Sequence, residues 1–299
     1  MTASLADYRR FYAEEIAAVT GIRSQALIEA FAQVPRENFL GPGPWQVGGL
    51  DMMAAQVKYC QTEDADPRRI YHNLVVVIDR ERNLNNGHPG TLAAWIDRLE
   101  LAPGEHVVHF GAGLGYYTAI IAEMVGPAGR VTGIEVDPEL ARRAQENLAP
   151  WPNADLLAGD AGTFDPGPVD AIFVNAGVTH PLALWLDRLK DRGRLLVPLT
   201  FDVGGGIGKG VVMLVKREDD RYSARLVSLV MIYSSTSVRE AEMNAALAKQ
   251  IASPKVFSVQ SLRRDAHNAE EMCWLHAEGF CFSQRDSDRE LLPVPSDHI

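Results

Sequence analysis

Three closely spaced glycines after a strand-like run constrain the fold of this chain most. Residues 107–110 are largely apolar, and Gly111, Gly113 and Gly115 follow them at intervals of two. A helical pattern over residues 118–125 comes next. Strand, glycine turn and helix in this order let the backbone approach a ligand closely at the N-terminus of a helix. The stretch therefore predicts a nucleotide-type binding turn within an α/β fold.

An acidic residue stands at the position that such a turn requires. A second β-rich run, residues 130–134, ends on Glu135, twenty residues after Gly115. In doubly wound sheets, an acidic side chain at the end of the second strand holds the ribose of a nucleoside. The glycines and the acid together therefore predict a nucleoside pocket.

The ends of the next two strands extend this pocket. The third strand leads into Gly159, Asp160 and Ala161. The Asp160 carboxylate can accept a hydrogen bond from an adenine amino group, and Ala161 offers its backbone N–H. The fourth strand ends at Asn175, over the mouth of the pocket, since open α/β sheets bind ligands at the carboxyl ends of their strands. This ordered series, with its Gly-x-Gly-x-Gly spacing, suits S-adenosylmethionine better than NAD.

Length and composition limit the class of protein. A chain of 299 residues with 46% hydrophobic residues can bury a large core, and its net charge of −10 argues against a nucleic-acid partner. The pair Arg263-Arg264 is the nearest approach to a basic patch. Only three cysteines occur, which suggests reduced thiols, and no apolar run approaches the length of a membrane span. We therefore expect a cytoplasmic protein without a membrane partner; a homodimer is an open alternative.

Strands and helices alternate from residue 101 to about residue 214. The expected strands are 107–110, 131–135, 155–158, 171–174 and 194–197, and the expected helices are 118–125, 138–148 and 181–190. Residues 209–216 and 223–230 are typical of an antiparallel hairpin at one edge. Upstream, residues 7–19, 24–31 and 91–99 have helical patterns, and residues 74–78 form a buried strand or extended segment. Such alternation predicts a mostly parallel sheet covered by helices.

The expected fold class is therefore α/β and Rossmann-like, with additions at both ends of the core. We expect three regions: an N-terminal helical, substrate-side region over residues 1–100, a ligand-binding core over residues 101–232, and a C-terminal extension over residues 233–299.

Six segments of the chain match a known family. They are residues 34–39 (VPRENF), 110–119 (FGAGLGYYTA), 129–135 (GRVTGIE), 139–141 (ELA), 174–177 (VNAG) and 193–198 (GRLLVP). From about Ala26 to Arg239, the chain thereby resembles the protein-L-isoaspartate O-methyltransferases, which are class I S-adenosylmethionine-dependent methyltransferases. The Gly-Tyr-x-Thr-Ala continuation is more specific to that family than the glycines before it.

The resemblance implies S-adenosylmethionine as the methyl donor and S-adenosylhomocysteine as the product. It also implies that Gly111, Gly113, Glu135 and Asp160 line the cofactor pocket. The full set of residues that we expect to bind the cofactor is Phe110, Gly111, Ala112, Gly113, Gly115, Tyr116, Thr118, Glu135, Val136, Gly159, Asp160, Ala161 and Asn175.

The chain departs from the family pattern at three places. Counting back from Gly111, Asn85-Asn86-Gly87 occupy the positions of the family's Thr-Ile-Ser, so the serine hydroxyl that the family uses near the isoaspartyl carboxylate is absent. His109 stands where an acidic residue is usual. An extension of some sixty residues follows Arg239. Cofactor use therefore transfers from the family more readily than the identity of the substrate.

The expected methyl acceptor is a carboxylate of a protein or peptide. A carboxylate is ionised at neutral pH and needs no base, so positioning supplies most of the rate. The residues expected to face the acceptor are Asn85, Asn86, His88 and Asn175. For a hydroxyl or amine acceptor, His88 or His180 would be the base. Two alternatives stay open: a small-molecule O- or N-methyltransferase, and a protein that binds S-adenosylmethionine without turnover.

A group of cysteine and histidine residues lies near the C-terminus. Cys273, His276 and Cys281 have the types of side chain that bind metal, and His267 could be a fourth ligand. This spacing is unlike that of the familiar zinc motifs. We favour thiols buried among aromatic residues and expect no metal site.

Overall fold

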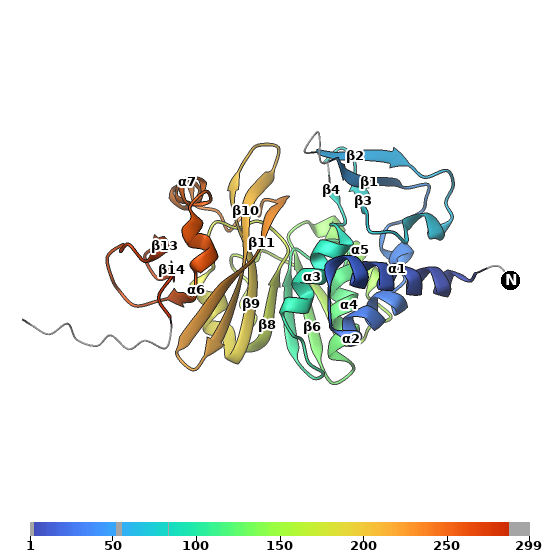
Figure 1. Cartoon of the computed structure of the whole chain (residues 1–299). Coiled ribbons are helices and arrows are strands. Elements are labelled where there is room, and N and C mark those ends of the chain that lie inside the picture. The colour runs from blue at the N-terminus through green and yellow to red at the C-terminus, as the bar shows by residue number, and fades with distance from the viewer. Residues whose placement is uncertain (1–2, 52–55, 83, 287–299) are drawn as a thin grey trace, which may run out of the picture. The chain divides into compact units, whose positions relative to one another are not determined.

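The computed structural model describes residues 3–51, 56–82 and 84–286 (Figure 1). The chain divides into two compact units, Met1–Phe164 and Asp165–Ile299. Within the described residues, the longest helices are too short or too polar to cross a membrane.

Two capped helices begin the first unit. Helix α1 (Leu5–Thr20) starts at Ser4, which forms a capping box with Asp7, and α2 (Gln25–Gln33) starts at Ser24. Capping side chains bind the first N–H groups of a helix, which otherwise lack partners. A 3-10 helix, η1 (Arg36–Phe39), follows. Both predicted helices are confirmed.

A small antiparallel sheet follows these helices. Its strands are β1 (Gln46–Asp51), β2 (Gln56–Gln61), β3 (Val75–Asp79) and β4 (Leu84–Asn85), in the order β2-β1-β3-β4, with the 3-10 helix η2 (Pro67–Ile70) before β3. Trp45, Ile70 and Val76 form part of its core. The buried Arg36 guanidinium donates to the carbonyl of Ile70 at 2.5 Å and to that of Leu74 at 2.7 Å. The guanidinium thereby fixes the chain that leads into β3.

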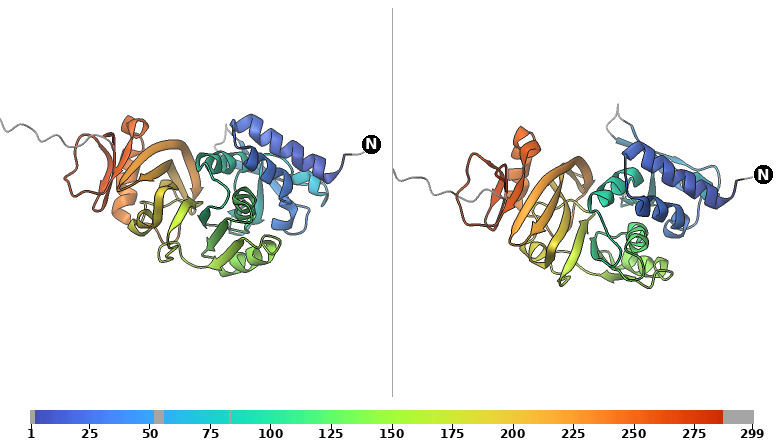
Figure 2. Two further views of the ribbon diagram at one scale, coloured as in Figure 1. Left: turned by 90° about the horizontal axis from the view of Figure 1, so that it is seen from below. Right: turned by 60° about the horizontal axis from the view of Figure 1, so that its bottom comes forward.

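The Rossmann-like part of the first unit is built as the sequence predicts. Helix α3 (Pro89–Arg98) precedes β5 (His106–Phe110), α4 (Tyr116–Val125), β6 (Arg130–Glu135), α5 (Pro138–Asn147) and β7 (Ala154–Ala158). The three strands pair in parallel in the order β5-β6-β7. Their carboxyl ends therefore meet at one edge. Figure 2 shows the blue to green helices of this unit gathered beside its strands.

The second unit continues with parallel strands and then turns antiparallel. It contains β8 (Val169–Val174), α6 (Ala183–Arg188), β9 (Leu189–Asp202), β10 (Ile207–Glu218), β11 (Arg221–Tyr233), α7 (Ala241–Gln250), η3 (Pro254–Ser258), β12 (Ser261–Arg263), β13 (Cys273–Ala277) and β14 (Phe280–Ser283). The strand order is β13-β14-β12-β11-β10-β9-β8, with β8 and β9 parallel and the later pairs antiparallel. The predicted hairpin is β10–β11, and β12 to β14 extend the antiparallel part beyond it.

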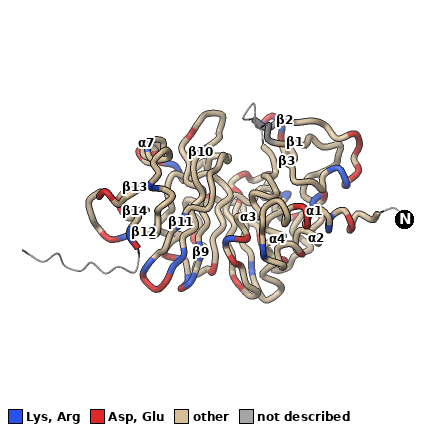
Figure 3. The backbone as a smooth tube through the Cα atoms, in the orientation of Figure 1, with Lys and Arg blue, Asp and Glu red and all other residues tan. Residues whose placement is uncertain are grey.

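Basic and acidic residues are interspersed along the described chain (Figure 3). The one basic pair noted in the sequence is neutralised locally. Arg263 forms ion pairs with Asp265 at 2.6 Å and Glu270 at 3.1 Å, and Arg264 pairs with Asp187 at 2.6 Å. These two arginines are therefore engaged by carboxylates of the chain itself.

Candidate cofactor and acceptor site

The loop between β5 and α4 turns on the three glycines. Gly111, Gly113 and Gly115 have φ angles of 74°, 57° and 88°, in the left-handed region that only glycine adopts without steric cost. The Gly111 N–H donates to the Ile134 carbonyl at 2.9 Å, which ties the loop to β6. A Cβ atom at Gly113 would meet nothing within 4 Å. Gly115 caps α4 without a side-chain hydrogen bond, so the first N–H groups of α4 can bind a ligand.

Glu135 holds this loop in shape. Its side chain is almost buried, with 8% of the residue exposed. Oε2 accepts a hydrogen bond from the Gly113 N–H at 2.8 Å, and Oε1 accepts one from the Asp137 N–H at 3.0 Å. Each carboxylate oxygen has two lone pairs, so both can also accept from ribose hydroxyl groups. One carboxylate can therefore shape the turn and bind the ligand.

The end of β7 lies beside the end of β6. The Gly159 N–H donates to the Glu135 backbone carbonyl at 2.9 Å. In the next turn, Asp160 Oδ1 accepts from the Gly162 N–H at 2.7 Å, which leaves Oδ2 to accept a further hydrogen bond. Val136 is 50% exposed despite its aliphatic side chain. An exposed apolar side chain after β6 and a polar acceptor after β7 are the kinds of group that bind the flat face and the polar edge of adenine.

Three of the expected cofactor residues have side chains that pack inside the unit. Phe110 is 1% exposed, and the ring of Tyr116 packs edge-on against Phe39 with centroids 5.5 Å apart. The Thr118 hydroxyl lies 2.9 Å from Nδ1 of His109. These buried side chains pack beneath the glycine loop and hold it in position. Any contribution of these residues to cofactor binding would therefore come from their backbone groups. Their role stays a prediction.

His109 is a buried histidine rather than an acid. Its complete burial lowers the pKa to about 3, so the ring is neutral at physiological pH. The hydrogen bond to Thr118 requires no charge on the ring. The position that is usually acidic in the family is therefore an uncharged support for α4 in this chain.

The segment Asn85-Asn86-Gly87 is shaped by its own side chains. Asn85 Oδ1 accepts from the Gly87 N–H at 2.9 Å, and Asn85 Nδ2 donates to the Tyr59 hydroxyl at 3.1 Å. Asn86 Oδ1 accepts from the Val76 N–H at 2.8 Å. Both asparagines thus have local structural bonds, and their contact with a methyl acceptor stays a prediction.

His88 caps helix α3. Its Nδ1 accepts a hydrogen bond from the Thr91 N–H at 3.4 Å. Partial burial lowers the pKa of His88, against the effect of a hydrogen bond to the Asn73 backbone. Capping gives this ring a structural role, and the role of a base stays a prediction.

Two further candidates lie in the second unit. Asn175 follows β8 directly and is half-buried. His180 Nε2 lies 3.3 Å from a Glu240 carboxylate oxygen, and its Nδ1 lies 2.9 Å from the Thr179 hydroxyl. Burial lowers the pKa of His180 although Glu240 opposes the shift. Their parts in the reaction stay predictions.

The parallel strands, the glycine loop and the acid at the end of β6 define a class I, Rossmann-like methyltransferase, a class that uses S-adenosylmethionine. The family model described as protein-L-isoaspartate(D-aspartate) O-methyltransferase matches residues 13–239. The chain belongs to this family. It is a methyltransferase that depends on S-adenosylmethionine, in a family that methylates protein carboxylates.

Relatives in sequence agree with this assignment, and two solved structures agree with the fold. Protein-L-isoaspartate O-methyltransferase 2 of Archaeoglobus fulgidus is 33% identical over 164 residues, which are 50% of this chain and 71% of the relative. The Methanothrix thermoacetophila protein-L-isoaspartate O-methyltransferase is 29% identical over 66% of this chain and 82% of its own. A solved protein-L-isoaspartate O-methyltransferase superposes with a TM-score of 0.61 at 22% identity, covering 81% of this chain and 69% of that one. A putative enzyme of this kind from Plasmodium falciparum, in complex with S-adenosyl-L-homocysteine, superposes with a TM-score of 0.58 at 18% identity, covering 76% and 98%.

Sequence reasoning missed several residues that shape the site. The hydrogen bond from the Asp137 N–H to Glu135 could not be predicted, because the sequence there shows only the helix-capping pattern Asp-Pro-Glu. Tyr59, the partner of Asn85, lies on β2, a strand that the sequence analysis did not predict. A long-range partner of this kind has no local signature. The four Cys and His side chains near the C-terminus do come together, although their spacing in the sequence is unlike that of the familiar zinc motifs.

Proposed function

We propose that this enzyme transfers a methyl group to an isoaspartyl-like carboxylate of a protein or peptide. The glycine loop, Glu135 and Asp160 would hold S-adenosylmethionine. The observation that supports the cofactor site is the buried Glu135 carboxylate bonded to the Gly113 N–H at 2.8 Å, because an acid beside a glycine loop is the arrangement that binds a ribose in doubly wound sheets. We also expect the enzyme to act in the cytoplasm, as a monomer or homodimer, without nucleic acid.

In this reaction the protein has to align the acceptor with the methyl group and does not have to transfer a proton. An acceptor carboxylate oxygen attacks the methyl carbon in line, a C–O bond forms as the C–S bond breaks, and the electron pair stays on sulfur in S-adenosylhomocysteine. The sulfonium supplies the electrophile. Because no proton moves, the neutral, capping state of His88 is compatible with the reaction. Holding the two reactants in line supplies most of the rate.

The acceptor side differs from the family at Gly87. Its φ angle is 77°, and a Cβ atom there would lie 2.6 Å from Cδ1 of Leu92. A serine would therefore be strained and would also displace Leu92. The segment is built around glycine, so an acceptor would be held by other groups, for which we propose Asn85, Asn86 and Asn175.

The test is methylation of an isoaspartyl peptide with a labelled methyl donor. The proposal predicts label on the isoaspartyl peptide that base treatment releases as methanol, and none on the matched peptide with a normal aspartate. The same assay with a Glu135→Ala variant controls for contaminating activity. Label on a small-molecule acceptor, with none on peptide, would support the small-molecule alternative and contradict this proposal.

A second candidate function follows from the same glycine. Loss of the family hydroxyl at Gly87 favours a protein that binds the cofactor without turnover. Calorimetry that detects binding of S-adenosylhomocysteine, together with no transfer to peptides, whole-cell protein or small molecules, would favour this function.

A further inference from the structure

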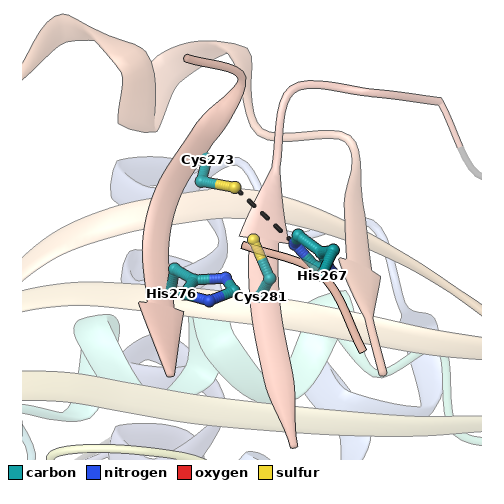
Figure 4. Close-up of side chains that lie close together, drawn as sticks. All are labelled: His267, Cys273, His276 and Cys281. Carbon is teal, nitrogen blue, oxygen red and sulfur yellow. Dashed lines mark hydrogen bonds between the residues drawn. The ribbon is translucent and has the colours of Figure 1, made fainter. Parts of the chain in front are cut away.

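Four metal-ligating side chains meet near the end of the second unit. His267, Cys273, His276 and Cys281 each offer one ligand atom, and these four atoms lie within 4.8 Å of one another. Figure 4 shows the four side chains directed toward a common centre. We call this group the Cys2His2 cluster. It lies outside the residues expected to bind cofactor or acceptor.

The hairpin β13–β14 explains how three of the four come together. His276 and Cys281 are paired across the two antiparallel strands, so their side chains lie on the same face. Cys273 is three residues before His276, and regular alternation would place it on the opposite face. The register shifts between Cys273 and Leu275. This irregularity changes the alternation and brings Cys273 to the face of the other two.

His267 lies in the loop after β12, and its ring is held in place by Asp265. Its Nδ1 lies 2.9 Å from the Asp265 carbonyl and 3.3 Å from an Asp265 carboxylate oxygen. Its Nε2 lies 3.8 Å from Sγ of Cys273. An Nδ1–H that donates to Asp265 leaves the Nε2 lone pair directed at the cluster. Metal-binding histidines in proteins are oriented by this kind of outer hydrogen bond.

Ion pairs fix the loop that carries His267. Arg263 binds Asp265 at 2.6 Å and Glu270 at 3.1 Å, and Arg285 also binds Glu270. The Glu270 N–H in turn donates to Sγ of Cys273 at 3.3 Å. The loop is therefore held by ion pairs near His267 and near Cys273. The sulfur of Cys273 also accepts a backbone hydrogen bond, which is a kind of bond that stabilises a thiolate.

A core of ordinary buried thiols does not account for the histidines. The rings of His267 and His276 lie with centroids 4.7 Å apart. Nδ1 of His276 is buried without a hydrogen-bond partner among the described residues. A buried polar atom without a partner is unfavourable because it has lost its hydrogen bonds to water. Coordination of a cation by the cluster would offset such costs.

We propose that the Cys2His2 cluster is a structural zinc site. Two thiolates and two neutral imidazoles balance the charge of Zn²⁺, and the two thiol protons leave to solvent on binding. Zn–S bonds of about 2.3 Å and Zn–N bonds of about 2.0–2.1 Å place tetrahedral ligand atoms about 3.4–3.8 Å apart. The 3.8 Å between His267 Nε2 and Cys273 Sγ is at the upper end of this range, and the other pairs, all within 4.8 Å, need a contraction of at most about 1.5 Å.

The proposed ion would hold the C-terminal strands together. Four protein ligands leave no open coordination position, which is the arrangement of structural rather than catalytic zinc. The ion would link the loop after β12 to both strands of the hairpin. Trp274, beside Cys273, donates to the Gln250 carbonyl at 3.1 Å and so connects the same hairpin to the end of α7.

Metal content of the full chain is the first test. Protein expressed with added zinc and purified without chelator should contain about one zinc ion per chain, measured by inductively coupled plasma mass spectrometry. The zinc content of the Cys281→Ser and His276→Gln variants should fall to that of the buffer. The matched control is Cys60→Ser, because Cys60 is an exposed cysteine on β2, far from the cluster in sequence; it should keep the ion.

Cobalt substitution tests the wild-type chain without any variant. Metal-stripped protein titrated with Co²⁺ should develop the visible absorption of a tetrahedral cobalt–thiolate site, saturating at about one equivalent, and Zn²⁺ should abolish it. A chain that folds normally with neither zinc nor this spectrum would overturn the proposal. So would a native mass showing that Cys273 and Cys281 are joined in a disulfide.

Discussion

At the residue scale, we propose that the Glu135 carboxylate both shapes the glycine loop and binds the cofactor. It accepts a hydrogen bond from the loop N–H of Gly113, and its remaining lone pairs can accept from ribose hydroxyl groups. Glu135→Ala should remove charge-assisted hydrogen bonds of about 1.5–3 kcal/mol. We therefore expect the Kd for S-adenosylhomocysteine to rise roughly 10- to 100-fold, measured by calorimetry.

The control for this prediction is Glu139→Ala. Glu139 is an exposed acid on α5 that pairs with Arg142 at 2.8 Å, and its removal should leave the Kd unchanged. Equal binding by wild type and Glu135→Ala would contradict the placement of the cofactor.

The buried ring of His109 makes the stability of the protein depend on pH. Its pKa is lowered to about 3 in the folded chain, from 6.5 for an exposed histidine. Below pH 6.5, the unfolded chain therefore binds a proton that the folded chain excludes. This contribution to stability is present above pH 6.5 and is lost as the pH falls toward 3, by up to about 1.4 kcal/mol per unit.

A His109→Gln variant should show a shallower fall in the free energy of unfolding below pH 6.5. Urea titrations at several pH values measure the slope for the variant and for wild type. The comparison variant is His72→Gln, which changes an exposed histidine and should keep the wild-type slope. Parallel curves for wild type and His109→Gln would show that His109 is not the titrating group.

At the element scale, a substitution in the glycine loop should weaken cofactor binding without unfolding the protein. Gly113→Ala would place a Cβ atom in open space at a φ angle of 57°, with a conformational cost of about 1–2 kcal/mol. The new methyl group would occupy the space beside the loop. We expect a folded variant, slightly destabilised, with cofactor binding lost or weakened at least about tenfold by calorimetry.

Gly21→Ala is the matched control for the loop variant. Gly21 has a φ angle of 66° at the end of α1, and a Cβ atom there also meets nothing within 4 Å. The two variants should lose similar stability, and only Gly113→Ala should lose binding. Similar cofactor affinities for both would show that the space beside Gly113 is not the ligand site.

The elements that the sequence predicted are those with a local signal. The apolar strand β5, followed by a turn that only glycine can form, was identified because turn chemistry and periodicity agree. Strand β1 was missed because Gly48-Gly49 interrupts its pattern, and β2 was missed because the alternation of Val57 and Tyr59 with polar residues is short; the two strands are stabilised by pairing with each other. The irregularity at Cys273 depends on the pairing of β13 with β14, so periodicity alone could not reveal that Cys273 and His276 share a face.

At the scale of the whole molecule, the two proposed sites belong to different compact units. The glycine loop, Glu135 and Asp160 all belong to the first unit, and the Cys2His2 cluster belongs to the second. The family match ends at Arg239, so it excludes the cluster. The proposed cofactor site therefore lies within the family match, and the proposed metal site lies in the extension after it.

This division predicts where each ligand protects the backbone from hydrogen exchange. Saturating S-adenosylhomocysteine should slow exchange in peptides covering residues 111–115 and 135–162, which contain the loop and its partners. Removal of zinc by a chelator should speed exchange over residues 261–283 by exposing the strands that the ion joins. Mass spectrometry of peptic fragments measures both, and the metal-deficient Cys281→Ser variant should show no further change with chelator. Faster exchange on chelation in that variant would mean that the chelator acts elsewhere in the chain, and unchanged exchange over 261–283 in wild type would contradict a structural ion.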